Sequence, residues 1–502
     1  MIFGNSDNLE SLTKMVSVMK SLLPSAQLIF LFLACMIQQG SAQRGNGPQQ
    51  FIGISKKSPS YFSFADGRPY VPVGINMINP SGRNHNNADS AFQEIEQWMK
   101  NLAENGGNYV RIWLSQSFWD MEDQAAGKYN EEKVHRIDRF VAMARKYGLR
   151  IKMTLEHFRS ITMEENPQSW AVKGVYHKSK GGPLDSIRQY LSSPEGRRLF
   201  LNKIDFYQKH FGNDTLFFGW ELWNEMNAVK GPEDDLFFEW NETMLREVKQ
   251  RFPENLVMQS LGSFDHENVR PVYKRMMLLP GNEVAQVHRY LDLGAKMEIC
   301  QAPMDLIASS AVDELVTYQT GKPLILAETG AVEPRHTGPS KYYPRDTAGT
   351  LLHDILFAPF FSGSAGAGMA WHWESYVHKN NLWYHFGRFQ EAIKGIDPIE
   401  EGFVPVRTET HAVRIYHLKG KKTSLFWIRD KSSHWESELE KGILPQSRKG
   451  IRLTPNETGL PRRARTIEVY DPWKNQWSVV KKKGTGFTLP DFKRSLVVRV
   501  VH

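Results

Sequence analysis

Short apolar runs alternate with amphipathic segments over most of the chain. The apolar runs are rich in Val, Ile, Phe and Trp and have the length of buried strands, whereas the segments between them repeat apolar positions at helical spacing. Residues 91–104 and 131–147 are two such helical segments, and Gly148 marks the end of the second. Eight strand candidates lie at residues 71–76, 108–113, 150–157, 216–225, 255–262, 283–290, 323–330 and 366–373.

This order of elements predicts a parallel sheet whose faces are covered by helices. Eight strand and helix units favour a closed (β/α)8 TIM barrel over an open doubly wound sheet. No Gly-x-Gly-x-x-Gly sequence follows the first strand, which argues against a dinucleotide-binding sheet. We therefore predict an α/β fold with a (β/α)8 barrel over residues 51–402.

The pattern changes near residue 403, where apolar and polar positions begin to alternate with period two around Gly, Pro and Asn. This alternation predicts an all-β domain over residues 403–502, with the form of a small antiparallel sandwich. No low-complexity linker separates it from the barrel, so we expect the two to dock closely. A hairpin is predicted before the barrel, where Asp66 and Gly67 separate alternating apolar residues.

The N-terminal segment is typical of a secretory signal peptide. Lys14 and Lys20 precede an apolar run at residues 28–37, and small and polar residues follow up to a cleavage point after Ala42. The run is shorter than a stable membrane span requires, which makes a membrane anchor the less favoured alternative. We expect residues 1–42 to be removed and the mature protein to be secreted or periplasmic, without a stable membrane span.

Composition and charge limit the classes of partner. The 502-residue chain is 41% hydrophobic and 12% aromatic, as expected of a globular protein with a large core. Its formal net charge is +8, but the basic residues are scattered and form no stripe with aromatic residues, so no nucleic-acid partner is expected. Cys35 would leave with the signal peptide, which leaves Cys300 alone and excludes an internal disulfide. The oligomeric state is left open.

Polar and aromatic residues stand at the C-terminal ends of the predicted strands, where the mouth of a barrel lies. Two of them are carboxylates, Glu225 at the end of the fourth strand and Glu328 in the seventh. Hydrolysis of a glycosidic bond uses such a pair, one acid to protonate the departing oxygen and one anion on the far face of the sugar. The other residues at these positions are Asn76, Arg111, His157, Asn224, His288, Tyr290 and Trp371 or Trp373.

Five short motifs together resemble the clan A retaining glycoside hydrolases, closest to family 5, over about residues 51–400. They are WELWNE and LAETG, with RIW upstream, HRY between them and WHW late in the chain. The resemblance makes residues 51–402 the catalytic domain. It implies that Glu225 is the acid/base, that Glu328 is the nucleophile, and that Asn224 bonds to the sugar 2-hydroxyl.

The same resemblance implies supporting roles around the two carboxylates. Arg111 would lie under Glu328 and keep it ionised, and Tyr290 would donate a hydrogen bond to the same carboxylate. His288 would lie near Glu225. The negative charge of Glu328 would raise the pKa of Glu225, which would then keep its proton until the glycosidic oxygen needs it.

The sugar itself would contact further residues that match the family pattern. His157 corresponds to the family histidine after the third strand, and Trp371 or Trp373 to the stacking tryptophan, since strand alternation turns both the same way. Long insertions at residues 158–193 and 331–343 carry further candidate sugar platforms. These candidates are Trp170, Tyr176, Tyr342 and Tyr343.

Several of these residues have a purely structural alternative. Glu221 is expected to be paired inside the barrel rather than to act in the mouth, and Arg111 could serve only as a core ion pair. The histidines at 157, 353 and 372 lack the spacing of metal ligands and are expected to be structural. No metal or cofactor is therefore expected.

Taken together, the residues and the resemblance predict a secreted retaining β-glycoside hydrolase that works by double displacement on a β-linked polysaccharide or oligosaccharide. Mannan-like and glucan-like substrates are both open, and the WEL run, similar to that of β-mannanases, favours mannan slightly. Two alternatives are a carbohydrate-binding protein on a barrel that has lost hydrolysis and a transglycosylase that uses the same site.

Overall fold

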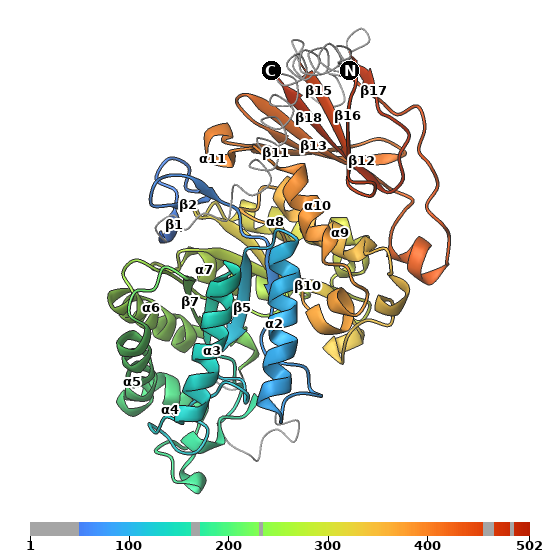
Figure 1. The fold of residues 1–502 in the computed structure, drawn as a ribbon. Coiled ribbons are helices and arrows are strands. Elements are labelled where there is room, and N and C mark those ends of the chain that lie inside the picture. Colours follow the sequence, from blue (N-terminus) through green and yellow to red (C-terminus); the bar gives the residue numbers. More distant parts are fainter. Residues whose placement is uncertain (1–49, 162–170, 230–233, 455–465, 482–485) are drawn as a thin grey trace, which may run out of the picture. The chain divides into compact units, whose positions relative to one another are not determined.

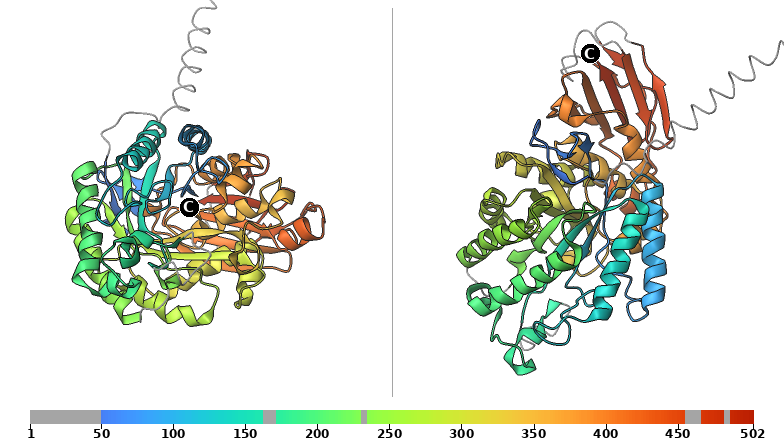
Figure 2. Two further views of the ribbon diagram at one scale, coloured as in Figure 1. Left: turned by 90° about the horizontal axis from the view of Figure 1, so that it is seen from below. Right: turned by 60° about the vertical axis from the view of Figure 1, so that its left-hand side comes forward.

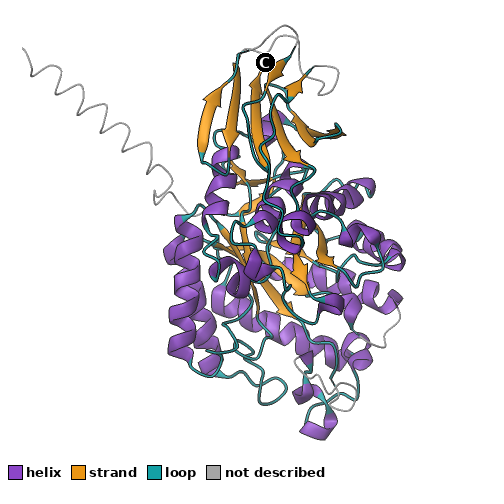
Figure 3. Ribbon diagram, turned by 90° about the vertical axis from the view of Figure 1, so that its right-hand side faces the viewer, coloured by secondary structure: helices purple, strands orange, loops and turns teal. Residues whose placement is uncertain are grey.

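The computed structural model describes residues 50–161, 171–229, 234–454, 466–481 and 486–502. A barrel of parallel strands is surrounded by helices, and an antiparallel sheet from the C-terminal part of the chain packs against it (Figure 1; Figure 3). The residues from Gln50 to His502 belong to one compact unit. The predicted signal peptide and Trp170 lie outside the described residues.

The barrel wall consists of parallel strands that follow chain order, and two further views show the helices around it (Figure 2). Five strands form one parallel sheet: β4 (Gly74–Asn76), β5 (Tyr109–Trp113), β6 (Arg150–Glu156), β7 (Phe217–Trp223) and β8 (Leu256–Met258). The strands β9 (Ala285–Asp292) and β10 (Leu324–Val332) form a parallel pair. Nearly every residue of these strands is buried, as their continuous apolar runs predict.

The eighth predicted strand is much shorter than expected. Within residues 366–373, only Ala370 makes bridges, parallel ones to Thr329 and to Ile75, which close the barrel between β10 and β4. The N–H of Gly368 bonds to the carbonyl of Ile355 at 3.2 Å, in a neighbouring helix, instead of joining a strand. Backbone hydrogen bonds still join the segment to both sides, from the N–H of Trp371 to Thr329 at 2.8 Å and from the N–H of Asn76 to Ala370 at 3.1 Å, so it closes the (β/α)8 barrel without forming a regular strand.

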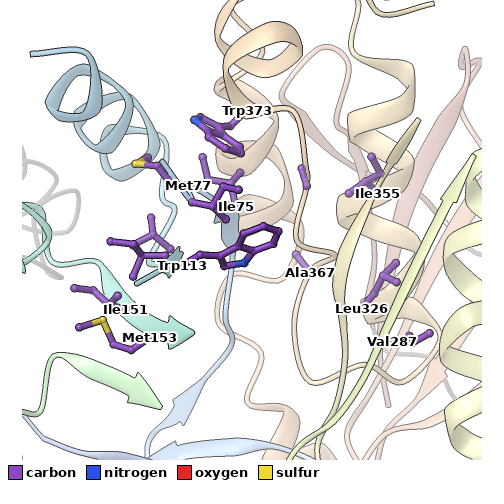
Figure 4. Close-up of a cluster of buried hydrophobic side chains, with 14 of the residues drawn as sticks. Ile75, Met77, Trp113, Ile151, Met153, Val287, Leu326, Ile355, Ala367 and Trp373 are labelled. Atoms are coloured by element: carbon purple, nitrogen blue, oxygen red, sulfur yellow. The ribbon is translucent and has the colours of Figure 1, made fainter. Parts of the chain in front are cut away.

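The helices begin and end at the residues that the sequence indicates. The side chain of Asn87 caps α2 (Ala88–Glu104), and Gly148, with φ of 69°, ends α3 (Glu131–Tyr147) in a left-handed conformation. The other longer helices are α5 (Pro194–Phe211), α6 (Asp234–Arg251), α7 (Arg270–Leu278), α8 (Met304–Thr317), α9 (Thr350–Phe361) and α10 (Tyr384–Ala392). Figure 4 shows part of the apolar cluster between strands and helices. Among the described residues, no helix has both the length and the apolar character that a membrane span needs.

An N-terminal hairpin covers the end of the barrel where the strands begin. Its strands are β1 (Ile52–Ile54), β2 (Phe62–Phe64) and β3 (Pro69–Tyr70), and the predicted turn at Gly67 has φ of 88°. Phe62 packs edge-on against Phe218 near the start of β7, with ring centroids 5.0 Å apart. The polar residues predicted for the site lie at the opposite end of the barrel, where the strands finish.

The C-terminal part of the chain forms an antiparallel sheet of six strands, which confirms the predicted β-rich character. In spatial order these are β11 (Val404–Glu409), β12 (Val413–Lys419), β13 (Thr423–Asp430), β18 (Ser495–Val501), β15 (Thr466–Asp471) and β16 (Gln476–Val479). A separate pair, β14 (Arg452–Leu453) with β17 (Phe487–Thr488), covers part of one face. The described residues of the C-terminal part thus form one large sheet and one small two-stranded sheet, and a complete sandwich stays a prediction.

The sheet packs tightly against the barrel, as the missing linker predicts. Trp427 of β13 belongs to the large apolar cluster of the barrel and its helices, whereas the preceding Phe426 faces the opposite way, toward β14 and β17. All residues of α9 are buried, because this helix lies between the barrel strands and the sheet. Two buried ion pairs cross the same interface, Arg414 with Asp305 at 2.5 Å and Arg429 with Asp354 at 2.8 Å.

Candidate active site

Two glutamates meet at the end of the barrel where the strands finish. Glu225 follows β7 and keeps 21% of its side chain exposed, while Glu328 lies within β10 and is 3% exposed. A register shift in β10 between Leu326 and Glu328 locally alters the pairing with β9 at this position. One oxygen of Glu225, one oxygen of Glu328 and a ring nitrogen of His288 all lie within 4.8 Å of one another. The structure therefore brings the two predicted carboxylates together.

Arg111 and Tyr290 hold the carboxylate of Glu328 from two sides. Nη1 of Arg111 donates a hydrogen bond to Oε1, and the hydroxyl of Tyr290 donates to Oε2 at 2.9 Å. Arg111 is fully buried and also donates to the side-chain oxygens of Asn224 at 2.8 Å and Asn76 at 3.2 Å. Both contacts predicted for Glu328 are thus present in the structure.

Glu221 holds Arg111 from inside the barrel, as its structural alternative predicts. Its carboxylate lies 2.5 Å from Nη2 of Arg111 and 2.9 Å from the amine of Lys152, and all three side chains are fully buried. Burial raises the pKa of Glu221, but the charges of Arg111 and Lys152 outweigh it and keep the pKa well below its ordinary value. Glu221 therefore fixes Arg111 and takes no place in the mouth.

A histidine ring and a guanidinium lie against the carboxylate of Glu225. Nδ1 of His288 lies 3.0 Å from Oε1 of Glu225, and Nη2 of Arg159 lies 3.3 Å from Oε2. Burial raises the pKa of Glu225, yet the hydrogen bond and charge of His288 lower it more, and Arg159 and His336 act in the same direction. The pKa therefore lies below its ordinary value, and the predicted rise caused by Glu328 is wrong, because these groups outweigh the neighbouring carboxylate.

Asn224, the residue before Glu225, uses only one of its two polar side-chain atoms in hydrogen bonds to the described residues. Its side-chain oxygen accepts from Arg111 at 2.8 Å, whereas its buried amide nitrogen has no hydrogen-bond partner among the described residues. A buried donor without a partner is unusual in a native protein, and it marks a place where a ligand hydroxyl could accept. The bond from Asn224 to the sugar 2-hydroxyl stays a prediction.

Of the two tryptophans predicted to stack on the sugar, Trp371 remains a candidate and Trp373 belongs to the core. Trp371 is half-buried and packs against Trp113, which in turn stacks on His157 at 5.3 Å. Trp373 is buried and packs edge-on against Trp98 of α2 (Figure 4 includes it in the apolar cluster). The expected common orientation is wrong, because the extended segment ends at Ala370 and Trp373 begins a π-helical turn, Trp373–His378.

This arrangement agrees with the known protein family that the chain matches. Residues 71–348, more than half of the 502, match the family described as Cellulase (glycosyl hydrolase family 5). The chain belongs to glycosyl hydrolase family 5. It is therefore a glycoside hydrolase, and its barrel agrees with the fold of a solved family 5 structure.

Curated relatives of this family 5 enzyme include two plant proteins. Mannan endo-1,4-beta-mannosidase 7 of Arabidopsis thaliana is 22% identical over 432 residues, covering 79% of this chain and 91% of the relative. Mannan endo-1,4-beta-mannosidase 4 of Oryza sativa subsp. japonica is 22% identical over 369 residues, covering 66% and 76%. A solved glycoside hydrolase family 5 structure from Bacteroides vulgatus has a TM-score of 0.51 and 10% identity, and the match covers 90% of this chain and 94% of that one. This last likeness is one of fold.

Three of the suggested sugar platforms of the family 5 enzyme are wrong. Tyr176, Tyr342 and Tyr343 are buried, and their hydroxyl groups serve contacts within the protein. A ring without an exposed face cannot stack on a pyranose. The candidate Trp170 lies outside the described residues.

Histidines singled out in the sequence have structural partners. The imidazole of His157 bonds to Ser115 at 2.6 Å, that of His353 to Ser495 at 2.8 Å, and that of His372 to Tyr343 at 3.1 Å. Burial lowers the pKa of His372 to about 3, so this ring is neutral near the site. Each of these histidines thus has a hydrogen-bond partner inside the protein, and the sugar contact implied for His157 stays a prediction.

Sequence reasoning missed Arg159 and His336. Arg159 follows His157 by two residues in a predicted insertion, so the only signal was a basic residue just past the end of a strand. His336 lies in the insertion after β10, with its ring 5.1 Å from that of Tyr290 and Nε2 3.6 Å from Asp292. Neither could be placed beside Glu225 without the fold.

Proposed function

We propose that this family 5 enzyme is a retaining β-glycoside hydrolase in which Glu328 is the nucleophile and Glu225 the acid/base. The supporting observation is the distance between the two carboxylates, whose nearest oxygens lie within 4.8 Å. Retaining enzymes place their carboxyl groups about 5–5.5 Å apart, whereas inverting enzymes need about 6.5–9.5 Å to admit a water molecule. The gap in this site favours direct attack by a side chain.

In the first step, Glu328 attacks the anomeric carbon while Glu225 gives its proton to the departing oxygen. The product is a glycosyl ester of Glu328 and an alcohol. Arg111 and Tyr290 both donate to Glu328 and so hold its carboxylate in place for the attack. Because Glu225 must carry a proton at this point and its pKa is held low, we expect the enzyme to work best at acidic pH.

In the second step, Glu225 takes a proton from water, and the hydroxide formed cleaves the ester. The groups that lower the pKa of Glu225 then assist, because they favour its basic form. The amide nitrogen of Asn224 is free to donate to the sugar 2-hydroxyl throughout. The half-buried Trp371 is the better candidate for stacking on the sugar ring.

For the substrate, we favour a β-1,4-linked mannan. Both plant relatives carry the name mannan endo-1,4-beta-mannosidase, and the WELWNE motif agrees with that choice. The apolar run at residues 28–37 supports export, so a polysaccharide outside the cell is a consistent substrate.

A hydrolysis screen over mannan, β-glucan, xylan and a uronic-acid polymer tests this function. We expect mannan to release sugars fastest, with the β-anomer detected first by proton NMR. Glu225→Gln and Glu328→Gln should each reduce the rate about 100-fold or more. First appearance of the α-anomer would contradict the retaining mechanism. Faster release of sugars from another polymer would reject mannan as the preferred substrate and leave the retaining mechanism standing.

A further inference from the structure

Arg159 contacts both the main chain of Asn224 and the side chain of Glu225, the proposed acid/base. Its Nη1 donates to the carbonyl oxygen of Asn224 at 2.6 Å, and its Nη2 donates to Oε2 of Glu225 at 3.3 Å. The side chain is 11% exposed. A guanidinium can serve two acceptors in a fixed geometry, whereas the ammonium of lysine acts as a point charge.

The peptide between Asn224 and Glu225 needs such support. Glu225 has φ of 50° and ψ of 53°, a left-handed conformation that a residue with a side chain rarely adopts. Arg159 bonds to the carbonyl of this peptide, and the hydroxyl of Ser260 lies 3.4 Å from its N–H. The unusual conformation that aims Glu225 into the mouth is therefore held from both sides.

Arg159 is itself fixed by the segment that follows β6. Its backbone N–H donates to the carbonyl of Ala171 at 2.7 Å, and the N–H of Lys173 donates to the carbonyl of Ser160 at 2.9 Å. The amine of Lys173 then bonds to the carboxylate of Asp120 at 2.6 Å. The guanidinium is thus supported by a hydrogen-bonded segment rather than by a free loop.

We propose that Arg159 is a positioning residue that fixes the Asn224–Glu225 peptide in its catalytic conformation and biases Glu225 toward its charged form. This inference rests on the function proposed above. In the reaction, the bias favours the step in which Glu225 accepts a proton from water, and it limits acid catalysis to low pH. Arg159 acts through Glu225, and the proposal includes no contact between Arg159 and the sugar.

Several charged or titratable groups face Glu225, and all of them bear on its titration. They come from β9, β10, α7 and the segments after β6, β8 and β10: His288, Tyr290, Glu328, Tyr273, Arg159, Asp265 and His336. Removing Arg159 takes away one positive charge and leaves the others. The proton affinity of Glu225 should then rise, and the alkaline limb of kcat/KM should move to higher pH by on the order of one unit.

The variants Arg159→Met, Arg159→Gln and Arg159→Lys test the proposal, with Arg198→Met as matched control. Within the part of the chain that the structure describes, Arg198 pairs with Glu195 alone on the exposed side of α5, so its loss should leave the pH profile unchanged. The kcat/KM profile is measured against pH on a β-1,4-mannan oligosaccharide and on a dinitrophenyl β-mannoside. The second substrate has a leaving group that needs no proton, so the shift of the limb should appear with the oligosaccharide alone.

We expect both neutral variants to shift the limb to higher pH and to lose about tenfold in kcat with little change in KM. Arg159→Lys should keep the position of the limb, because it keeps the charge, and should still lose rate, because one ammonium cannot hold both acceptors. Circular dichroism checks that each variant is folded. If Arg159→Met does not fold, Arg159→Gln takes its place as the neutral variant. An unshifted limb in a folded neutral variant would overturn the proposal while leaving the hydrolase function intact.

An infrared titration gives a readout that does not depend on activity. The carboxyl band that disappears in Glu225→Gln reports the protonation of Glu225 directly. This band should appear at higher pH in Arg159→Met than in the unmodified enzyme. If no substrate is hydrolysed at all, the proposed function fails, and the infrared band still decides whether Arg159 controls Glu225.

Discussion

The carboxylate of Glu328 depends on side chains from two other strands of the barrel. Arg111 from β5 and Tyr290 from β9 each donate a hydrogen bond to it, and all three side chains are buried. A buried carboxylate without such partners would be strongly destabilised as an anion. The nucleophile role proposed for Glu328 therefore requires both donors, and removing the tyrosine hydroxyl tests this requirement directly.

Tyr290→Phe removes one of these donors and keeps the ring. A hydrogen bond to a charged group contributes about 1.5–3 kcal/mol, so kcat should fall about 10- to 100-fold with little change in KM. Steady-state kinetics on the substrate found by the screen measure this. Tyr70→Phe is the control, because its hydroxyl bonds to the carbonyl of Asn108 near the opposite end of the barrel. Equal losses in the two variants would argue against a specific role for Tyr290.

The sequence predicted residues of the site whose chemistry is tied to strand ends. Glu225 and Glu328 could be paired in advance because the ends of parallel strands converge at one mouth. Of the groups beside Glu225, His288 was predicted from its strand end and lies 3.0 Å away, whereas Arg159 and His336 were not, since they come from insertions whose paths no periodicity indicates. For the same reason the direction of the pKa shift of Glu225 was predicted wrongly.

At the scale of elements, the strands and helices followed their hydrophobic periods closely. The segment 366–373 formed no regular strand, because the N–H of Gly368 bonds to Ile355 of α9, although residues on both sides of Gly368 still bond to the neighbouring strands. Contacts between elements distant in the chain override a local pattern in such places. The same holds where α8 meets β12, since nothing near Asp305 in the sequence indicates its partner Arg414.

The pairing of α8 with β12 predicts a pH-dependent loss of stability in Asp305→Asn. Burial raises the pKa of Asp305, but the charge and hydrogen bonds of Arg414 lower it more, so the folded pKa lies below the unfolded one. The carboxylate then stabilises the fold above its unfolded pKa of about 3.9, and this contribution is lost as the pH falls through the folded value.

We expect Asp305→Asn to lower the free energy of unfolding at pH 7 by about 3–5 kcal/mol, because it leaves Arg414 buried and unpaired. Thermal unfolding from pH 7 down to pH 3 should show the difference from the unmodified protein shrinking below about pH 4. Asp313→Asn on the same helix is the control, since its ion pair with Arg407 is partly exposed and should contribute less than about 1 kcal/mol. A difference that stays constant with pH would contradict the argument.

At the scale of the whole molecule, the barrel and the sheet share one apolar core. Tyr416, Trp427 and Val497 of the sheet belong to the same buried cluster as the barrel strands. Removing the sheet would expose these contacts and leave Asp305 and Asp354 without their arginine partners. The barrel should therefore depend on the sheet for its stability.

A chain that ends at Gly402 tests this dependence. We expect it to aggregate on expression, because the large apolar surface that the sheet covers would face water. Size-exclusion chromatography and thermal unfolding measure the outcome, with the full chain as reference. A soluble, monomeric barrel with the unfolding temperature of the full chain would show that the sheet is dispensable.

The helix α9 has no exposed residue from Thr350 to Phe361, since the barrel covers one side and the sheet the other. Every substitution along it must satisfy two neighbours at once, so the helix should change little unless both change with it. An exchange of the C-terminal part between related enzymes would then succeed only with the helix included. The natural crossover point for such a chimera lies before Thr350, within the barrel, and not at the start of the sheet.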